Sequence, residues 1–250
     1  MAVTLPAIAA VIAAGFLAGA INTIVGSGSL ITFPTLLAVG FPPVVANVSN
    51  TVGLVFGSVS GVVGYRRELR TQTRRALLLA PATVAGAIVG AALLLVLPQR
   101  VFQSVVVVLI AIAVLLVLVQ PRLSGHVGPR LAGRTGAIAL PIGILLTAIY
   151  GGYFGAAQGV ILISLLSIAL TDPLQELNAL KNVLAAIVNG VAAVYFLVFA
   201  KVAWEPAVLI AVSSVAGGQA GAILGRRLSP LVLRGVIVSA GIAAIVKLLV

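Results

Sequence analysis

Long apolar segments separated by short polar ones dominate the pattern of hydrophobic and polar positions along this chain. Eight of these segments have the length of a membrane-crossing helix, which needs about 20 apolar residues. They lie at about 5–25, 43–65, 76–97, 101–119, 136–153, 174–200, 206–224 and 230–250. The pattern therefore predicts an all-α polytopic membrane protein.

Two shorter apolar runs follow the first and the fifth long segment. At 30–39 and 160–170, they would extend only about 15 Å as helices, because a helix rises about 1.5 Å per residue. Each run lies behind a break, Gly26-Ser27-Gly28-Ser29 in the first case and Gly155-Ala156-Ala157-Gln158-Gly159 in the second. Glycine permits the sharp turn that a hairpin needs at such a place. We predict two short, Gly-broken helices that are re-entrant or half-spanning.

The second half of the chain repeats features of the first half in the same order. The first half contains Ala46-Asn47-Val48-Ser49-Asn50-Thr51-Val52, which resembles Leu177-Asn178-Ala179-Leu180-Lys181-Asn182-Val183 in the second. It also contains Ala85-Gly86-Ala87-Ile88-Val89-Gly90, which nearly recurs as Ala220-Gly221-Ala222-Ile223-Leu224-Gly225. Matches in the same order indicate an internal duplication rather than chance similarity between apolar helices. We expect an N-terminal membrane repeat at 1–120, a cytoplasmic linker at 121–135 and a C-terminal membrane repeat at 136–250.

The basic residues orient these halves across the membrane. Three loops hold 11 of the 15 Lys and Arg residues: five Arg at 66–75, three at 122–134, and Arg226, Arg227 and Arg234. Because cytoplasmic loops carry an excess of Lys and Arg, all three should be cytoplasmic. The loop at 66–75 and its repeat equivalent near Lys201 then face opposite sides. We therefore predict inverted-topology repeats, which are typical of secondary transporters.

The overall composition excludes a soluble domain. Hydrophobic residues make up 62% of the 250 residues and charged residues only 8%, and the mean hydropathy is +1.29. In water such a chain would expose large apolar areas. The net charge of +11 follows from the cytoplasmic loops, so it indicates no nucleic-acid partner. The segment 5–25 resembles a signal peptide, but no basic residue precedes it, and we interpret it as a first membrane helix.

Few side chains offer catalysis or metal binding. The chain has no Cys, and its single His126 lies in a polar loop, where we expect it to be solvated. Only four residues are acidic, and none lies deep within an apolar segment, so the sequence offers no evident proton-relay carboxylate. A set of acid, base and nucleophile is not recognisable either. We expect neither enzymatic activity nor a cofactor or metal site.

Polar residues within the apolar segments gather around the two breaks. An unpaired polar group in hydrocarbon costs several kcal/mol, so these residues should line an enclosed cavity or pair with one another. Inverted topology would bring the two breaks together near the midplane, where the short helices begin. A helix N-terminus carries a partial positive charge that suits an anion, and Lys181 adds a full charge, so we predict a small oxyanion as substrate. The candidate substrate-binding residues are Asn22, Ser27, Gly28, Ser29, Asn47, Asn50 and Thr51 in the first half and Gln158, Asn178, Lys181 and Asn182 in the second, and the polar set also includes Thr23, Ser49 and Asn189.

Structural interpretations compete with binding for these residues. Asn, Ser and Thr often form hydrogen bonds between membrane helices. Lys181 could instead extend to the cytoplasmic edge or pair with Glu176 or Asp172. Tyr65 and Trp204 suit interfacial anchors. Close helix packing is the expected role of Gly57, Gly61, Gly86, Gly90, Gly221 and Gly225.

A known family shares several motifs of this chain. The stretch Gly26-Ser27-Gly28-Ser29-Leu30-Ile31-Thr32-Phe33-Pro34-Thr35-Leu36-Leu37, together with residues 46–51 and 217–228, resembles the TauE/SafE family of sulfite exporters, also described as permeases for organosulfonates. The resemblance covers essentially the whole chain. It implies transport of sulfite, sulfonates or related anions across the bacterial cytoplasmic membrane, coupled to an ion gradient. The second break departs from the family pattern, since Gly-Gly-Gly and Pro are expected where this chain has Ala156, Ala157, Gln158 and Ile163.

These observations predict a multi-pass protein of the cytoplasmic membrane that exports a small sulfur-containing anion by alternating access. The expected partners are the anion, the lipid bilayer and, as one option, a coupled proton that travels with the substrate as hydrogen sulfite. Two alternatives stay open: a transporter of another small solute, including a metal cation, and a non-transporting membrane scaffold or assembly protein. A homodimer is compatible with the sequence, which specifies neither the coupling ion nor the direction of transport.

Overall fold

A computed structural model of the protein describes residues 4–124, 134–224 and 230–249, which form helices and turns without β-strands. His126, Gly225, Arg226, Arg227 and most of the predicted linker lie outside the described residues. The helices, in chain order, are α1 (Leu5–Ile24), α2 (Ser29–Ala38), α3 (Pro43–Gly64), α4 (Arg66–Leu69), α5 (Thr73–Val96), α6 (Gln99–Ser124), α7 (Arg134–Tyr153), α8 (Gln158–Ala169), α9 (Leu174–Phe199), α10 (Trp204–Leu224) and α11 (Pro230–Leu249).

The lengths of the helices confirm a polytopic membrane protein. Six of the described helices, α1, α3, α5, α6, α9 and α10, are long and apolar enough to cross a bilayer. α7 and α11 contain 20 residues each. The two short helices, α2 and α8, contain 10 and 12 residues and begin directly behind the two predicted breaks. The eight long segments and the two short ones of the sequence therefore all appear as helices.

Large apolar side chains cover the outside of the molecule. Val96, Leu77 and Val212 are 78%, 69% and 71% exposed, and many other Val, Leu and Ile residues are also exposed. A soluble protein would bury such side chains, whereas a bilayer solvates them. The outward-facing surface of the helices therefore suits lipid.

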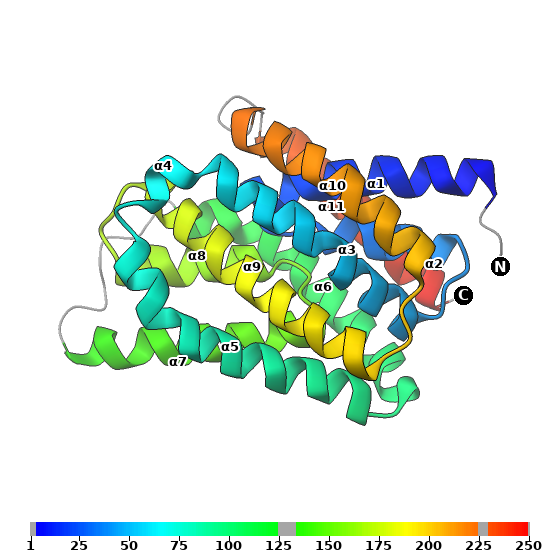
Figure 1. Ribbon diagram of the computed structural model, residues 1–250, viewed down its shortest axis with the longest axis horizontal. Helices are drawn as coiled ribbons and strands as arrows, with labels where there is room; N and C mark the ends of the chain where they lie inside the picture. Colours follow the sequence, from blue (N-terminus) through cyan, green and yellow to red (C-terminus); the bar gives the residue numbers. More distant parts are fainter. Residues whose placement is uncertain (1–3, 125–133, 225–229, 250) are drawn as a thin grey trace.

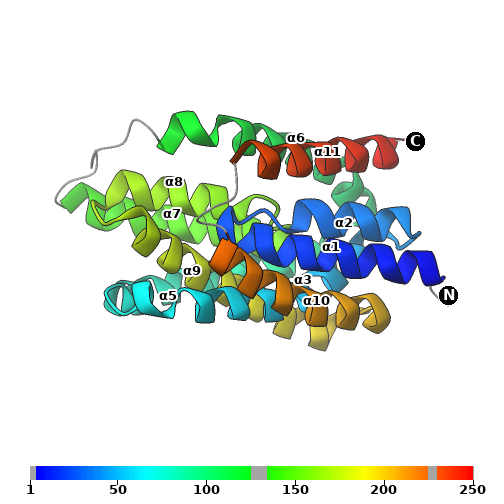
Figure 2. The same cartoon turned by 90° about the horizontal axis from the view of Figure 1, so that it is seen from above.

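Helices in matching places of the two halves make matching contacts. The first half gives α1, α2, α3, α5 and α6, and the second gives α7, α8, α9, α10 and α11 in the same order. α1 packs along α10 as α7 packs along α5, α3 packs on α10 as α9 packs on α5, and α2 packs on α11 as α8 packs on α6. Each half therefore supplies helices to the bundle of the other. Figure 2 shows α6 and α11 as an outer pair beside the layer that contains the two hairpins.

The two halves run in opposite directions. Figure 1 shows the α3 to α5 connection, which carries α4, at one end of the long axis, and the α9 to α10 connection at the other end. The short helices also diverge, since α2 extends toward the end with the chain termini and α8 toward the end with α4. This arrangement is the inverted repeat that the distribution of Arg residues predicts.

The same backbone motif ends α1 and α7. Gly26 and Gly155 have φ angles of 86° and 77°, in the region that glycine adopts without strain. Their N–H groups donate to the carbonyl oxygens five residues earlier, Ile21 at 3.0 Å and Tyr150 at 3.2 Å. A left-handed glycine with such a bond is a common way to close a helix. The two breaks are therefore equivalent in backbone structure although their sequences differ.

Glycines allow the long helices to approach one another closely. A Cβ atom at Gly57, Gly61, Gly86, Gly90 or Gly221 would collide with a neighbouring helix, which confirms their predicted packing role.

Trp204, at the start of α10, is 61% exposed, as an interfacial residue should be. Tyr65 is only 2% exposed and packs with Ala179 and Ala222. The prediction of an interfacial anchor is therefore wrong for Tyr65, because the end of α3 lies against α9 and α10.

Candidate functional site

The two breaks touch each other inside the molecule. The Gly159 N–H group, at the start of α8, donates a hydrogen bond of 2.9 Å to the carbonyl oxygen of Gly26. A Cβ atom on either glycine would overlap the Cα atom of the other. Only two glycines can come this close, so Gly26 and Gly159 fix the crossing of the hairpins. The prediction that the breaks face each other is confirmed.

Side chains of the opposite half cap the broken ends of α1 and α7. The last carbonyl groups of a helix have no partner within the helix, so in a membrane interior they need one elsewhere. Asn47 on α3 donates through Nδ2 to the carbonyl oxygen of Tyr153 at 3.0 Å. Its repeat equivalent Asn178 on α9 donates to the carbonyl oxygen of Thr23 at 3.5 Å. The end of α7 is thus held by α3 and the end of α1 by α9, each a long helix of the other half.

Lys181 reinforces the cap on α1. Its side chain is fully buried, and Nζ lies 3.1 Å from the carbonyl oxygen of Thr23 and 3.4 Å from that of Asn22. A cation is favourable there, because the C-terminal end of a helix is partially negative. Extension to the cytoplasmic edge is therefore wrong as an interpretation of Lys181. Pairing of Lys181 with Asp172 or Glu176 is also wrong, because these carboxylates bond to residues in and just before the first turn of α5.

Asn50, the repeat equivalent of Lys181, binds within its own half. It is fully buried, donates to Ser29 Oγ at 3.1 Å and accepts a hydrogen bond from the Thr32 hydroxyl. Asn50 therefore ties α3 to the first turn of α2. Thr51 uses its hydroxyl on its own helix, donating to the carbonyl oxygen of Asn47 at 2.9 Å.

Ser58 joins the two halves at a place that the candidate list omits. Its hydroxyl accepts hydrogen bonds from Asn22 Nδ2 at 3.2 Å and from Asn189 Nδ2 at 2.9 Å. Ser58 and Asn189 lie at the same distance along the chain from Asn47 and Asn178, so they are equivalent positions of the repeat. The alignment of the two halves was the signal that could have found Ser58. Ser49 contributes differently, by accepting the Ala203 N–H at 2.8 Å and holding the start of α10.

Four buried hydrogen-bond donors on the two breaks and on α7, α8 and α9 have no partner among the described residues. They are the hydroxyl of Ser27, Nε2 of Gln158, Nδ2 of Asn182 and the hydroxyl of Tyr153, and their residues are 0%, 3%, 5% and 9% exposed. Oδ1 of Asn47 is a buried acceptor that also has no partner among the described residues. A buried donor without a partner is costly, so such groups mark a place where a polar ligand or water can bind.

The main-chain N–H groups at the start of the short helices are mostly bonded within the protein. In α8, those of Gln158, Gly159 and Val160 donate to the carbonyl oxygens of Gly155, Gly26 and Ala157. In α2, those of Leu30 and Ile31 donate to Ser27 and Gly28. The helix dipoles still point their positive ends at the crossing. A ligand at the crossing would therefore receive its hydrogen bonds mainly from side chains. Gly28 packs against α1, where a Cβ atom would press on the Ala18 carbonyl oxygen.

An aromatic cluster supports the second break and was not predicted. Phe33 on α2, Phe102 on α6 and Phe154 at the second break are buried and meet edge to face, with ring centroids 5.2 to 6.4 Å apart. Such rings stabilise each other through contacts between ring edges and faces. The cluster ties α2 to the break of the other half. Phe residues in an apolar sequence give no signal of this role.

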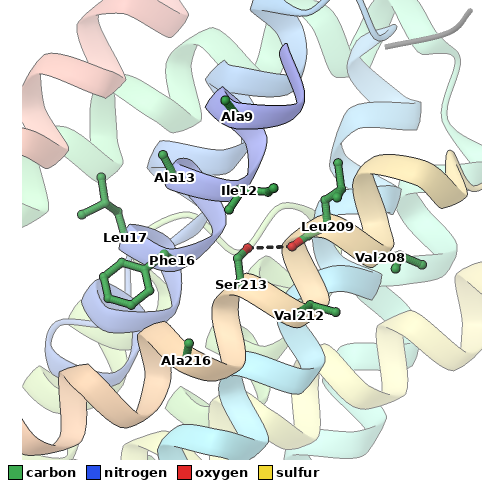
Figure 3. A pocket seen from close by; sticks show the side chains of 10 residues that line it. All are labelled: Ala9, Ile12, Ala13, Phe16, Leu17, Val208, Leu209, Val212, Ser213 and Ala216. Carbon is green, nitrogen blue, oxygen red and sulfur yellow. Dashed lines mark hydrogen bonds between the residues drawn. The ribbon is translucent and has the colours of Figure 1, made fainter. Parts of the chain in front are cut away.

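The groove between α1 and α10 is a different kind of hollow. Its volume is about 920 Å³ and its walls are apolar except for Ser213. Figure 3 shows Phe16 and Leu17 of α1 and Val208 and Val212 of α10 around it, while the Ser213 hydroxyl bonds to the Leu209 carbonyl oxygen at 2.6 Å. An anion would find no free donor in this groove. The polar crossing, not the groove, is therefore the candidate site.

A polar contact joins the halves at the end of the molecule where α4 lies. Arg75 at the start of α5 forms an ion pair of 2.6 Å with Asp172 in the α8 to α9 connection. Gln72 Nε2 donates to Asp172 at 3.0 Å and to Glu176 at 2.8 Å, and Thr71 donates to Glu176 at 2.5 Å. Burial alone would raise the pKa of the Asp172 carboxyl, but hydrogen bonds from Arg75 and Gln72 and the charge of Arg75 hold this pKa below its usual value. The sequence did not reveal this contact, because its residues are about 100 positions apart.

Comparison with known proteins identifies the family. The model of the sulfite exporter TauE/SafE family matches residues 11–248, nearly the whole chain. The chain belongs to this family. It is therefore a membrane transporter, as the inverted repeats and broken helices indicate.

The curated relatives carry general names. A probable membrane transporter protein from Sinorhizobium, ORF9, is 28% identical over 94% of this chain and 90% of its own length. The probable membrane transporter protein YfcA from Escherichia coli is 27% identical over 93% of this chain and 86% of its own. A probable membrane transporter protein from Haemophilus influenzae is 26% identical over 83% of this chain and 81% of its own length. No solved structure matches this chain. These names support a transport function, but they name no substrate.

Proposed function

We propose that this protein is a secondary transporter that exports a small sulfur-containing anion, sulfite or an organosulfonate, across the cytoplasmic membrane. The observation that carries the proposal is the crossing of the two hairpins. A fully buried Lys181 and four buried donors without protein partners lie on the helices and breaks that meet there. Donors and positive charge are what an oxyanion requires. The description of the family as sulfite exporters supports both the substrate and the direction.

Ser27, Gln158 and Asn182 are the proposed direct ligands of the anion. Each offers a neutral donor that the protein leaves unused. Asn47, Asn50, Asn178 and Lys181 have a second role in this proposal, because they hold the broken helix ends and α2 in place. The site is therefore preorganised by residues that also cap the backbone.

Alternating access follows from the arrangement of the halves. The two hairpins enter from opposite ends and meet through the close contact of Gly26 with Gly159 and through the packing of Phe33 against Phe154. A rocking motion of one bundle against the other would open the crossing to one side at a time. In this structure Ser27, Asn50 and Lys181 are all fully buried, which corresponds to a closed arrangement. The ion pair of Arg75 with Asp172 joins the two halves on the proposed cytoplasmic side and is compatible with closure there.

Uptake into proteoliposomes tests the proposal. Purified protein should show saturable flux of radiolabelled sulfite, and the Asn182→Ala and Gln158→Ala variants should reduce this flux by about tenfold or more. A hydrogen bond to a charged group is worth about 1.5–3 kcal/mol, and about 1.4 kcal/mol corresponds to a factor of ten. Ser213→Ala is the matched control, because its hydroxyl lies in the outer groove and bonds to its own helix.

Two results would overturn the proposed function. The first is absence of saturable flux for sulfite and for sulfonates in proteoliposomes that contain folded protein. The second is equal flux through wild type, Asn182→Ala and Gln158→Ala, because a polar crossing that binds no anion tolerates these changes. Such tolerance is what a non-transporting membrane scaffold predicts.

A further inference from the structure

The charges of the chain are distributed very unequally between interior and surface. All four carboxylates, those of Glu68, Asp172, Glu176 and Glu205, are at least partly exposed, and none lies within the packed interior. Among the described residues, the buried formal charge is that of Lys181. The interior around the crossing therefore contains one positive charge and no negative charge.

Neutral groups surround that charge. The Lys181 ammonium donates to two main-chain carbonyl oxygens, which stabilise it without neutralising it. Glu176 is the acidic residue of the same helix, five residues earlier, and accepts hydrogen bonds from Thr71 and Gln72 near the surface. A buried formal charge without a counter-charge is costly, since water solvates it far better than a protein interior does.

From this charge balance we infer that the transport site accepts singly charged oxyanions and rejects doubly charged ones. The inference rests on the proposed function and specifies its substrate class. One monoanion neutralises Lys181, so the closed site carries no net charge. A dianion would leave one uncompensated negative charge in the same low-dielectric interior, with a penalty similar to that of an unpaired lysine.

The neutral groups of the site fit a singly charged sulfur head group. A sulfonate group and hydrogen sulfite each carry one negative charge and three oxygen atoms bonded to sulfur. Ser27, Gln158, Asn182 and Tyr153 provide unused neutral donors for such oxygen atoms. Asn47 provides the unused acceptor, whose identity as oxygen is fixed because Nδ2 of the same amide donates to the Tyr153 carbonyl. This acceptor can receive the single proton of hydrogen sulfite, and sulfate at neutral pH has no proton to offer it.

Competition on the wild-type protein in proteoliposomes tests the inference with three probes of similar shape. Methanesulfonate carries one charge, sulfate carries two and dimethyl sulfone carries none. Uptake is followed with radiolabelled sulfite at a pH where hydrogen sulfite is present. We expect methanesulfonate to inhibit uptake at a concentration at least about tenfold lower than sulfate or dimethyl sulfone requires, which corresponds to about 1.4 kcal/mol.

The Lys181→Met variant provides a second measurement, because methionine keeps much of the volume and removes the charge. In protein that elutes as a single species, we expect methanesulfonate to lose its advantage over dimethyl sulfone. Equal inhibition by sulfate and methanesulfonate in the wild type would overturn the monoanion inference and leave the proposed function intact. So would unchanged preference for methanesulfonate in folded Lys181→Met. Absence of saturable sulfite uptake would overturn the proposed function itself.

Discussion

At the scale of single residues, the central feature of this transporter is how it satisfies backbone groups where helices break inside a membrane. Three side chains, Asn47, Asn178 and Lys181, provide donors for carbonyl oxygens that α1 and α7 leave free. Water would do this in a soluble protein, but hydrocarbon cannot. Residues that sequence reasoning assigns to substrate binding therefore also carry a structural role.

The two Asn caps should differ in strength although they are repeat equivalents. Asn47→Ala leaves the Tyr153 carbonyl without its 3.0 Å partner, whereas Asn178→Ala removes a 3.5 Å bond to a carbonyl that Lys181 also contacts. We expect Asn47→Ala to destabilise the protein by about 1–3 kcal/mol and Asn178→Ala by less than about 1 kcal/mol. Thermal unfolding in detergent, compared at equal protein concentration, measures the difference. A larger loss for Asn178→Ala would contradict this account of the caps.

Gly26→Ala adds only one methyl group, but we expect it to prevent correct folding. A methyl group at this position would overlap Gly159, and the φ angle of 86° is unfavourable for alanine. We expect little folded protein in a size-exclusion profile of the purified variant. Gly190→Ala on α9 is the matched control, because a Cβ atom there meets nothing within 4 Å. Near-normal yield of Gly26→Ala would show that the hairpins do not need this close approach.

The polar residues at the breaks were predictable from sequence, but their partners were not. Asn50 and Lys181 stand out because polar residues are rare in apolar segments. Nothing in the sequence showed that Asn50 binds Ser29 and Thr32 while Lys181 binds the end of α1. The two equivalent residues differ because Asn50 on α3 faces α2 of its own half, whereas Lys181 on α9 faces α1 of the other half.

At the scale of secondary-structure elements, hydropathy predicted the helices well. Apolar length alone separates α2 and α8 from the long helices. The short helix α4 was missed, because it contains only four residues of a polar loop. The contact between the start of α5 and the connection that follows α8 was also missed, since polar loop residues carry no pattern that reveals their partners.

This contact should weaken in acid. The pKa of Asp172 is held below its usual value in the folded protein, so the carboxylate stabilises the fold above its unfolded pKa of about 4 and loses this effect as the pH falls through the folded pKa. The effect should be modest, because the Arg75 side chain is 41% exposed. We expect wild type to unfold at a higher temperature than Asp172→Asn at pH 7, and the gap to close below about pH 4.

Unfolding midpoints from pH 7 to pH 3 in one detergent measure this gap. Glu205→Gln is the control, because Glu205 is exposed at the start of α10. We expect this variant to have the same profile of unfolding midpoints as the wild type. A gap of constant size at every pH would show that the Asp172 carboxylate does not supply the stabilisation.

At the scale of the whole molecule, the inverted architecture was predictable because two independent signals agree on it. Repeated sequence indicates two similar halves, and the Arg residues indicate opposite orientations. The exchange of α5 and α10 between the bundles was not predictable. Helices of similar apolar composition can pack in several ways, and small-residue positions such as Gly57 and Gly90 are compatible with many partners.

Single-cysteine labelling tests the inverted architecture directly, because the chain contains no Cys and needs no background substitutions. Arg70, beside α4, and Lys201, in the α9 to α10 connection, are exposed. Figure 1 shows these two segments at opposite ends of the molecule. In spheroplasts, a membrane-impermeant maleimide should label Lys201→Cys without permeabilisation and Arg70→Cys only after it. Arg70→Cys keeps four Arg residues in its loop, so the topology signal persists. Labelling of both cysteines from the same side would contradict opposed halves, and with them a transport site built where two hairpins meet.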